Sequence, residues 1–576
     1  MENIIKKNDI SLVLCGAAGQ GIKTVEELLT KTLKMSGFNV FATREYMSRV
    51  RGGVNSTSIR ISSEKVRAFS ERIDFLFPLN DSAIPHLKDK LNPDSVIIGE
   101  KNFIEQDSDA PGVRIEVPFL EISKDVGGKV YANIVVLGLI CNLLNADKAI
   151  LHNLLEENFS SKGTEVVQNN IKATDKGFEK ATQLIDEGKL TRVISIKTNE
   201  DVINDYIIDG TQAIALGAIA GGVNYVTFYP MAPSTGIGTF LAQQGTEFSI
   251  IVDQSEDEIS VINKALGASY AGARALVSTS GGGFSLMGEG VSLTGMSELP
   301  LVIIVGQRPG PATGMPTRTA QEDLNLVLHA GAGYFPRMIF APNSIEEAYL
   351  LTQNAFNLTQ EYQVPVFILT DQYLVDSYYN IKKIEYETLK RKNFIIKTER
   401  DYERYKFTAS GISPRGIPGY GVGLVDADSH THTEVGDITE DPELRIQTVK
   451  KRLKKFALIK DNALAPEYFG SNDIKYLIIS WGSSFYLIKE ALEILNRSDV
   501  GFLHFKQVYP LNEVTNNYVS KAEKIIVIES NPTAQFGNLI ELETHRKTDH
   551  VILKYSGYTF SVEEILDRIK KVIEGI

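Results

Sequence analysis

The middle of the chain alternates short apolar runs with segments of helical spacing, and this alternation limits the possible folds more than any other feature. Between about residues 206 and 380, six runs read as β-strands separated by helical segments: YVTFYP, FSIIVD, ALVSTS, LVIIVG, RMIFAP and VPVFILTD. Such alternation is typical of a parallel, doubly wound sheet. Ligands bind at the carboxyl ends of the strands in such sheets. We therefore expect an α/β domain at 206–380 with a ligand site at one edge.

The rest of the chain predicts a multidomain α/β protein, because 576 residues are too many for one hydrophobic core. Residues 1–190 begin with an apolar run, a glycine loop and a helical segment from Ile22 to Met35, which together predict a first α/β domain. Residues 381–465 show poor periodicity and predict a connector that wraps another domain or carries function. The α/β alternation resumes at 466–576 and predicts a third, smaller domain.

Composition narrows the class of function. The formal net charge of −12, without an evident basic stripe, argues against a nucleic-acid binder and favours small-molecule chemistry. No window holds the roughly eighteen apolar residues of a membrane span, so we expect a cytoplasmic protein without a membrane segment.

The two cysteines, Cys15 and Cys141, lie inside apolar segments, where free cysteine behaves as a small buried hydrophobe. We expect no disulfide between them. A [4Fe–4S] cluster needs four thiolates, so this chain cannot hold one alone. If electrons leave through iron–sulfur centres, another subunit carries those centres.

The segment YPMAPSTG ends one predicted strand and opens a helix. Its two prolines fix the backbone, while Ser234 and Thr235 can cap the helix and offer hydroxyls at the carboxyl end of a strand. An ordinary capped turn is the alternative; it would explain the serine, but it would not require the two prolines. The residues that we select here as candidates are Tyr229, Pro230, Pro233, Ser234 and Thr235.

A glycine turn and an arginine loop follow the next two strands. Ser280, Gly281 and Gly282 belong to the segment TSGGGFS, whose glycines would let the backbone approach a flat ligand; a floppy surface loop is the alternative. Arg308 and Arg318 lie in a loop stiffened by prolines and glycines, where they are well placed to bind a carboxylate bidentately.

Glu258 belongs to the acidic start of a helix, Glu256-Asp257-Glu258, after the strand FSIIVD. Acids in a first helical turn usually complement the helix dipole on a wet face, and this interpretation suits Glu256 and Asp257. We expect Glu258 to face the tightly packed side, in the direction of Asn263 and Gly267.

The first domain carries a second glycine motif, GAAGQG at 16–21, between its first strand and first helix. Backbone N–H groups and the helix dipole can bind a phosphate there, although a tight packing turn is equally consistent with the pattern. The order of the glycines does not support NAD binding. The candidates are Gly16, Gly19, Gln20, Gly21 and Lys23. Arg51-Gly52-Gly53 could contact an anion or a partner, and a solvated hairpin turn explains it at least as well.

Taken in order, these motifs resemble the 2-oxoacid:ferredoxin oxidoreductases. YPMAPSTG looks like the family's YPITPS element, SEDEISVINKALGASYAGAR like its catalytic-glutamate helix, and GQRPGPATGMPTRTAQEDL like its substrate-arginine loop. Residues 1–190 resemble its γ domain, 206–380 its pyrimidine-binding thiamine diphosphate domain, and 466–576 its transketolase C-terminal-type domain. The resemblance covers essentially the whole chain as a γ–α fusion, an α subunit.

The resemblance implies a reaction. In the family, the glutamate matching Glu258 is catalytic: it hydrogen-bonds the aminopyrimidine ring of thiamine diphosphate and favours the imino tautomer that deprotonates the thiazolium carbon. The residues that would lie on the cofactor side are Tyr229, Pro230, Pro233, Ser280, Gly281 and Gly282. Arg308 or Arg318 would hold the substrate carboxylate. The γ domain would help bind coenzyme A, which takes the acyl group, and ferredoxin would receive the electrons.

The resemblance also implies a partner. The chain lacks a GDG followed by an asparagine some twenty-five residues on, the usual magnesium–diphosphate motif, and it lacks cluster cysteines. We expect a separate β subunit to hold the diphosphate with Mg²⁺ and a [4Fe–4S] cluster, in an αβ or (αβ)₂ complex.

The sequence departs from the family at Ala232, where the family has a threonine whose hydroxyl faces the substrate. Either Ser234 or Thr235 supplies this hydroxyl or the substrate contacts differ. We favour 2-oxoglutarate, with pyruvate and branched-chain 2-oxoacids as alternatives. A non-oxidative thiamine enzyme and a non-catalytic assembly subunit are further alternatives.

His430 and His432, two residues apart beside acids, could suggest a metal site. The connector offers no convincing third ligand, so we assign no metal to this chain and expect a polar loop at a domain interface.

Overall fold

The computed structural model describes residues 8–18, 21–48, 52–193, 196–384 and 390–575. The chain forms two compact units. The first comprises Met1–Ile208, Ser377–Ile384 and Ser561–Glu563, and the second comprises Asp209–Asp376, Glu385–Phe560 and Glu564–Ile576.

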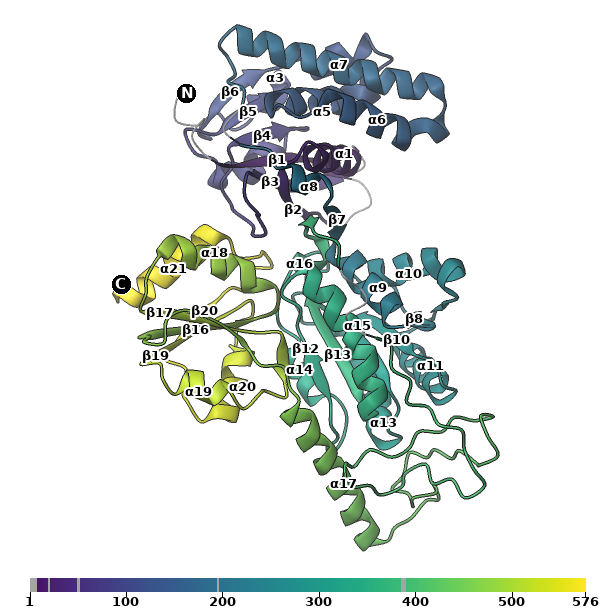
Figure 1. Cartoon of the computed structure of the whole chain (residues 1–576). Coiled ribbons are helices and arrows are strands. Elements are labelled where there is room, and N and C mark those ends of the chain that lie inside the picture. The colour runs from purple at the N-terminus through teal and green to yellow at the C-terminus, as the bar shows by residue number, and fades with distance from the viewer. Residues whose placement is uncertain (1–7, 19–20, 49–51, 194–195, 385–389, 576) are drawn as a thin grey trace. The chain divides into compact units, whose positions relative to one another are not determined.

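The first unit is built on an eight-stranded mixed sheet with the order β6-β5-β4-β1-β3-β2-β14-β7 (Figure 1). The strands are β1 (Asp9–Ala18), β2 (Asn39–Glu45), β3 (Gly52–Ser62), β4 (Phe75–Pro78), β5 (Val96–Gly99), β6 (Val113–Glu116), β7 (Tyr206–Asp209) and β14 (Tyr378–Ile381). The helices are α1 (Ile22–Met35), α2 (Ala83–Leu87), α3 (Lys101–Ile104), α4 (Phe119–Lys124), α5 (Ala132–Leu143), α6 (Lys148–Phe159), α7 (Thr164–Asp186) and α8 (Glu200–Ile203). The helix predicted from Ile22 to Met35 is confirmed, and its apolar positions Val25, Leu29 and Leu33 are buried.

Strand β14 lies on the other side of a domain boundary from the one that we predicted. We placed residues 206–380 in the second domain, but Tyr378 of β14 pairs antiparallel with Ala42 of β2 in the first sheet. The Tyr378 hydroxyl also donates a hydrogen bond to the buried carboxylate of Glu26 on α1. Pairing between strands so distant in sequence leaves no local signal, which is why periodicity placed the boundary elsewhere.

The second unit begins with a seven-stranded sheet of order β18-β12-β13-β11-β10-β8-β9. Its strands are β8 (Tyr225–Phe228), β9 (Ile251–Gln254), β10 (Ala275–Ser280), β11 (Leu301–Gln307), β12 (Met338–Phe340), β13 (Pro365–Asp371) and β18 (Gln507–Tyr509). Its helices are α9 (Gly210–Ala220), α10 (Thr235–Phe248), α11 (Glu258–Tyr270), α12 (Gly281–Phe284), α13 (Gly288–Met296), α14 (Leu324–His329), α15 (Ile345–Tyr362) and α16 (Gln372–Asp376). The six strands from β8 to β13 pair in parallel, as predicted, and only β18 is antiparallel.

A five-stranded sheet of order β15-β17-β16-β19-β20 completes the second unit. Its strands are β15 (Glu467–Phe469), β16 (Tyr476–Trp481), β17 (Val500–Phe505), β19 (Lys524–Glu529) and β20 (His550–Leu553), and its helices are α18 (Phe485–Leu495), α19 (Thr515–Val519), α20 (Gln535–Thr544) and α21 (Val562–Glu574). One apolar core joins the two sheets, with Ile303 and Phe367 of the first and Ile479 and Phe505 of the second in the same cluster. The C-terminal sheet is therefore packed against the doubly wound sheet.

The region predicted as a connector contains a long helix, α17 (Pro442–Asp461), that its poor periodicity concealed. Lys451 and Lys455 lie one helical turn apart on α17, and their ammonium groups each lie 2.7 Å from a different carboxylate oxygen of the buried Glu298. A buried carboxylate must be paired to stay ionised. These ion pairs hold α17 against Glu298, which lies just after α13. Because charged side chains make this contact, an apolar pattern could not predict the helix.

Among the described residues, no helix is long and apolar enough to cross a lipid bilayer.

Candidate active site

Glu258 is the first residue of α11 and is buried, with 4% of its surface exposed. The preceding Asp257 caps the helix by accepting a hydrogen bond from the Ser260 N–H at 2.7 Å. Capping fixes where the helix begins and thereby where the Glu258 side chain lies. The expected direction needs a correction. Asn263 and Gly267 are exposed, and the face that Glu258 shares is formed by buried residues one and two turns on: Val261, Ile262 and Ala265.

The Glu258 Oε1 atom is buried and has no hydrogen-bond partner in the protein. A buried polar atom without a partner costs about 1–3 kcal/mol, and more when it is charged. Folded proteins therefore rarely leave one unless another molecule completes it. This oxygen is accordingly a candidate contact for a bound ligand.

The glycine turn after β10 is an ordered helical turn, so the floppy-loop alternative is wrong. Gly281–Phe284 form α12, and Gly281 and Gly283 are buried while Gly282 is exposed. A Cβ atom on Gly283 would lie 2.4 Å from Glu258 Oε1 and 2.4 Å from Thr279 Oγ1. A Cβ atom on Gly281 would lie 2.2 Å from Asp323 Oδ1. These glycines make room for two carboxyl groups of the protein itself.

The YPMAPSTG segment follows β8 and divides into an exposed and a buried part. Tyr229 and Pro230 are exposed, and Pro233 is buried 3.0 Å from where a Cβ atom on Gly306 would lie. The Ser234 hydroxyl donates to the Met231 carbonyl at 2.8 Å, so it does not cap α10 as predicted. The Ser234 hydroxyl oxygen accepts no hydrogen bond from the first N–H groups of the helix. Thr235, the first residue of α10, is half-buried.

The two arginines of the loop after β11 have different surroundings. Arg308 is 8% exposed, its Nη1 donates to the Ala232 carbonyl at 2.8 Å, and its Nε is buried without a partner. Burial lowers the pKa of the Arg308 guanidinium, and Asp323 partly opposes this shift. Arg318 is 9% exposed, and its guanidinium lies 4.6 Å from the ring centroid of Tyr558. Arg308 is therefore the arginine with a buried donor still to be satisfied.

Five buried polar atoms without partners lie at the carboxyl ends of β10 and β11 and at the starts of α11 and α14. They are Glu258 Oε1, Ser280 Oγ, Gln307 Nε2, Arg308 Nε and Asp323 Oδ2. Contacts link their positions, because Gly283 meets Glu258, Gly281 meets Asp323, and Asp323 acts electrostatically on Arg308. Both donors and acceptors are present, so the set suits a polar ligand.

Sequence reasoning missed the part of the chain that holds the arginine loop in place. The side chain of Gln321 donates to the Trp481 carbonyl at 3.0 Å and accepts from the Ser530 N–H at 3.0 Å. The Thr319 N–H donates to the Gly557 carbonyl at 3.0 Å. Trp481 ends β16, Ser530 directly follows β19, and Gly557 lies in the loop after β20, so all three partners belong to the C-terminal part of the second unit. The polar segments WGSS (481–484) and ESNP (529–532), at the ends of two apolar runs, were the available signal.

Asp371 at the end of β13 was also missed. The hydroxyls of Ser483 and Thr319 donate to its carboxylate at 2.5 and 3.4 Å, and the Leu374 N–H donates at 3.0 Å. Burial raises the pKa of Asp371, and these hydrogen bonds oppose the rise. Asp371 therefore joins the arginine loop to the WGSS turn.

In the first unit, the first residues of the predicted glycine loop belong to a strand. Gly16 pairs with Asn55 inside β1, so it is a strand residue and not a turn residue. Gly21 precedes α1 with φ of 78°, a left-handed conformation that favours glycine. The Lys23 side chain is 73% exposed and lies 3.8 Å from Glu27. Gly19, Gln20 and Arg51 lie outside the described residues.

The histidines of the connector contact neighbouring side chains of the protein, and the two cysteines are buried. His430 Nδ1 lies 2.6 Å from Asp428 Oδ1, and His432 stacks on Tyr405 with ring centroids 3.6 Å apart. Burial raises the pKa of both thiols, that of Cys15 to about 12. In the described parts of the chain, no cluster of three or more histidines, cysteines and carboxylates could hold a metal.

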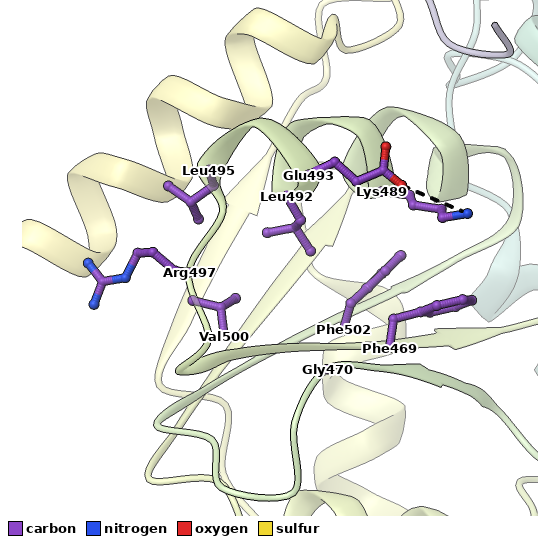
Figure 2. A pocket seen from close by; sticks show the side chains of 9 residues that line it. All are labelled: Phe469, Gly470, Lys489, Leu492, Glu493, Leu495, Arg497, Val500 and Phe502. Carbon is purple, nitrogen blue, oxygen red and sulfur yellow. Dashed lines mark ion pairs between the residues drawn. The ribbon is translucent and has the colours of Figure 1, made fainter. Parts of the chain in front are cut away.

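Figure 2 shows a separate hollow beside α18 and the edge strand β15. Apolar side chains of Leu492, Val500 and Phe502 line it, and Lys489 and Glu493 form an ion pair of 3.9 Å at its rim. None of the predicted site residues lies in it.

Family models match both parts of the chain that carry the motifs. Residues 216–451 match "Pyruvate flavodoxin/ferredoxin oxidoreductase, thiamine diP-bdg", and residues 11–180 match "Pyruvate ferredoxin/flavodoxin oxidoreductase". Together with the doubly wound sheet, these matches define the class as a thiamine-diphosphate-dependent oxidoreductase of 2-oxoacids, and they confirm the predicted fold class.

Individual relatives narrow the class. The 2-oxoacid:ferredoxin oxidoreductase subunit alpha of a Sulfolobus species is 30% identical over 98% of this chain and 97% of its own. The 2-oxoglutarate synthase subunit KorA of Methanocaldococcus jannaschii is 32% identical over 62% of this chain and 97% of its own. The solved 2-oxoglutarate:ferredoxin oxidoreductase from Magnetococcus marinus, with 2-oxoglutarate, coenzyme A and succinyl-CoA bound, superposes with a TM-score of 0.92 at 28% identity, over 98% of this chain and 100% of that one. The chain belongs to the 2-oxoacid:ferredoxin oxidoreductases, as an alpha subunit.

Proposed function

We propose that this chain, as the γ–α fused subunit, oxidatively decarboxylates 2-oxoglutarate with coenzyme A. The bond between the 2-oxo carbon and the carboxylate breaks, CO₂ leaves, and a thioester bond forms to the acyl carbon. The thiol proton is released, and two electrons pass to ferredoxin. One observation carries this proposal: the five unsatisfied buried polar atoms lie in the domain whose family binds thiamine diphosphate.

The residues present fit the pyrimidine end of thiamine diphosphate. Glu258 Oε1 is a buried acceptor without a partner, and the Ser280 hydroxyl is a second buried group able to accept or donate. When bound, thiamine diphosphate supplies the electron sink that decarboxylation of a 2-oxoacid needs. Glu258 would hold a proton-bearing ring nitrogen in place, and the exposed side of Tyr229, Pro230 and Gly282 would lie toward the cofactor.

Arg308 is the arginine that we assign to the substrate carboxylate. Its Nε has no partner and is buried, whereas the Arg318 guanidinium already lies over the Tyr558 ring. A hydrogen bond to a carboxylate stabilises binding more when its donor is buried than when its donor is exposed to water. We assign Arg318 to the same loop as a positioning residue. Ser234 is a weaker substrate contact than predicted, because its hydroxyl donates to a backbone carbonyl, and Thr235 supplies the accessible hydroxyl.

Relatives support the choice of 2-oxoglutarate. The KorA subunit and the Magnetococcus marinus enzyme are both named for this substrate. Ala232 offers only its carbonyl to Arg308, so a side-chain hydroxyl at that place is not what orients the arginine. Pyruvate and branched-chain 2-oxoacids are the competing substrates.

The site also needs a partner. We propose a β subunit that holds the diphosphate, Mg²⁺ and a [4Fe–4S] cluster in an αβ or (αβ)₂ complex, because two buried cysteines cannot bind a cluster. Coenzyme A is assigned to the first unit, near Gly21 and Lys23. The cytoplasmic location stays a prediction from the sequence.

The test is reduction of ferredoxin or a viologen by the α–β complex. We expect reduction that requires both coenzyme A and a 2-oxoacid, with kcat/KM highest for 2-oxoglutarate. A higher kcat/KM for pyruvate or a branched-chain 2-oxoacid would overturn the substrate, and no reduction with any 2-oxoacid would overturn the function.

A further inference from the structure

Asp323 lies against the glycine turn and does not perform the role that its position suggests. It is the N-cap residue of α14, where aspartate usually accepts a hydrogen bond from the helix, yet its side chain makes no capping bond. Its carboxyl instead lies over Gly281, so close that a Cβ atom there would meet Oδ1 at 2.2 Å and Oδ2 at 2.3 Å. Its Oδ2 is buried without a hydrogen-bond partner. Helix capping therefore does not explain this carboxyl.

The guanidinium that acts on the charge of Asp323 belongs to Arg308. Each acts on the charge of the other, but neither the Arg308 Nε nor the Asp323 Oδ2 has a partner, so the two are not joined by a hydrogen bond through these atoms. Gln307 holds the Asp323 backbone in place, because its side-chain oxygen accepts from the Asp323 N–H at 3.1 Å. The carboxyl is thus fixed near a guanidinium that it does not neutralise.

Opposing effects set the pKa of the Asp323 carboxyl group. Burial raises its pKa from the ordinary value to about 7, the neighbouring Glu322 adds to the rise, and Arg308 opposes it. Among the described residues, Glu322 and Arg308 are the charged groups that shift this pKa, and the carboxyl group of Glu258 lies against Gly283 of the same glycine turn. Helix α12 presents only glycines and a phenylalanine, and Gln535 of the C-terminal sheet contacts the Glu322 carbonyl with an uncharged amide. A carboxyl group with a pKa of about 7 changes charge around neutral pH.

We propose that Asp323 is a positioning residue that competes with the carboxylate of the 2-oxoacid for Arg308. Ionised, it attracts the guanidinium and repels the substrate. Protonated, it leaves Arg308 free for the substrate carboxylate. Binding of the 2-oxoacid then takes up one proton at Asp323, because a second anion beside this carboxyl favours its protonated form. This inference rests on the proposed function of Arg308.

The test compares Asp323→Asn with the unchanged α–β complex between pH 6 and 8.5. Asparagine matches the protonated carboxyl in shape and charge. In the unchanged complex, we expect the KM for 2-oxoglutarate to rise about tenfold per pH unit above the midpoint, with kcat changed much less. In Asp323→Asn, we expect a low KM that no longer depends on pH. The control Glu322→Gln should keep the rise in KM with its midpoint moved to lower pH.

A second measurement needs no variant. Calorimetric titration of the unchanged complex with 2-oxoglutarate at pH 8, in buffers of different ionisation enthalpy, should show net uptake approaching one proton per site. A KM profile shared by the unchanged complex and Asp323→Asn, or binding without proton uptake, would overturn this inference alone. Absence of turnover with every 2-oxoacid would instead overturn the proposed function.

Discussion

Two strand–glycine–helix segments, 16–21 in the first unit and 280–284 in the second, look alike in sequence, but their described glycines have different surroundings. At 280–284, the space above the glycines is filled by the carboxyl groups of Glu258 and Asp323. At Gly21, no atom of the described residues lies within 4 Å of where a Cβ atom would be, and the left-handed backbone is the feature that favours glycine there. The same residue type therefore serves side-chain packing in one turn and backbone conformation in the other.

The largest effect should come from Gly283→Ala. The added methyl carbon would lie 2.4 Å from Glu258 Oε1, which is too close, so the carboxyl group would have to move. A shift of about 1 Å at a reacting group can cost about 100-fold in rate. We expect such a loss of ferredoxin reduction by the α–β complex, with the secondary structure retained.

Gly267→Ala on the exposed face of α11 is the matched control for this variant. Nothing lies within 4 Å of its added methyl group, and alanine favours a helix over glycine by about 0.5–1 kcal/mol. Activity should therefore be kept and stability slightly raised. Equal activity of the two variants would remove the distinction between a packed and an open glycine.

Arg308→Gln should come next. Removing a buried charged donor of a carboxylate costs about 2–5 kcal/mol, which corresponds to a rise of about 30-fold or more in the KM for the 2-oxoacid. Arg308→Lys keeps the charge and loses the planar fork, so it should recover only part of the loss. An unchanged KM in Arg308→Gln, with the effect found in Arg318→Gln instead, would reverse our assignment of the two arginines.

Gly21→Ala should have the smallest effect. Its φ of 78° costs an alanine about 1–2 kcal/mol, and no atom obstructs the methyl group. Chemical denaturation should show this loss in the free energy of unfolding, while turnover at saturating coenzyme A stays near that of the unchanged complex. A loss of turnover as large as that of Gly283→Ala would show that the two turns are alike after all.

How far the sequence predicts this molecule follows from the distance over which each feature is encoded. Helix α1 and the parallel strands were predicted because their apolar spacing is local. The position of β14 and the role of the C-terminal segments around Gln321 were not predicted, since each depends on a partner far along the chain. The bond of Ser234 was missed for another reason: the local sequence allows either a helix cap or a bond to the carbonyl three residues back, and the structure shows the second. Glu258 could be selected as a candidate, but the unpartnered state of its Oε1 and the presence of Asp323 above Gly281 required three-dimensional packing.

The central claim is that Glu258 activates thiamine diphosphate, and the direct measurement is hydrogen–deuterium exchange at the thiazolium C2 atom in the assembled α–β complex. Glu258→Gln keeps the size of the side chain and removes its charge and basicity. We predict that the exchange rate falls about 100-fold or more, with cofactor content and complex assembly unchanged. An exchange rate equal to that of the unchanged complex would contradict the account.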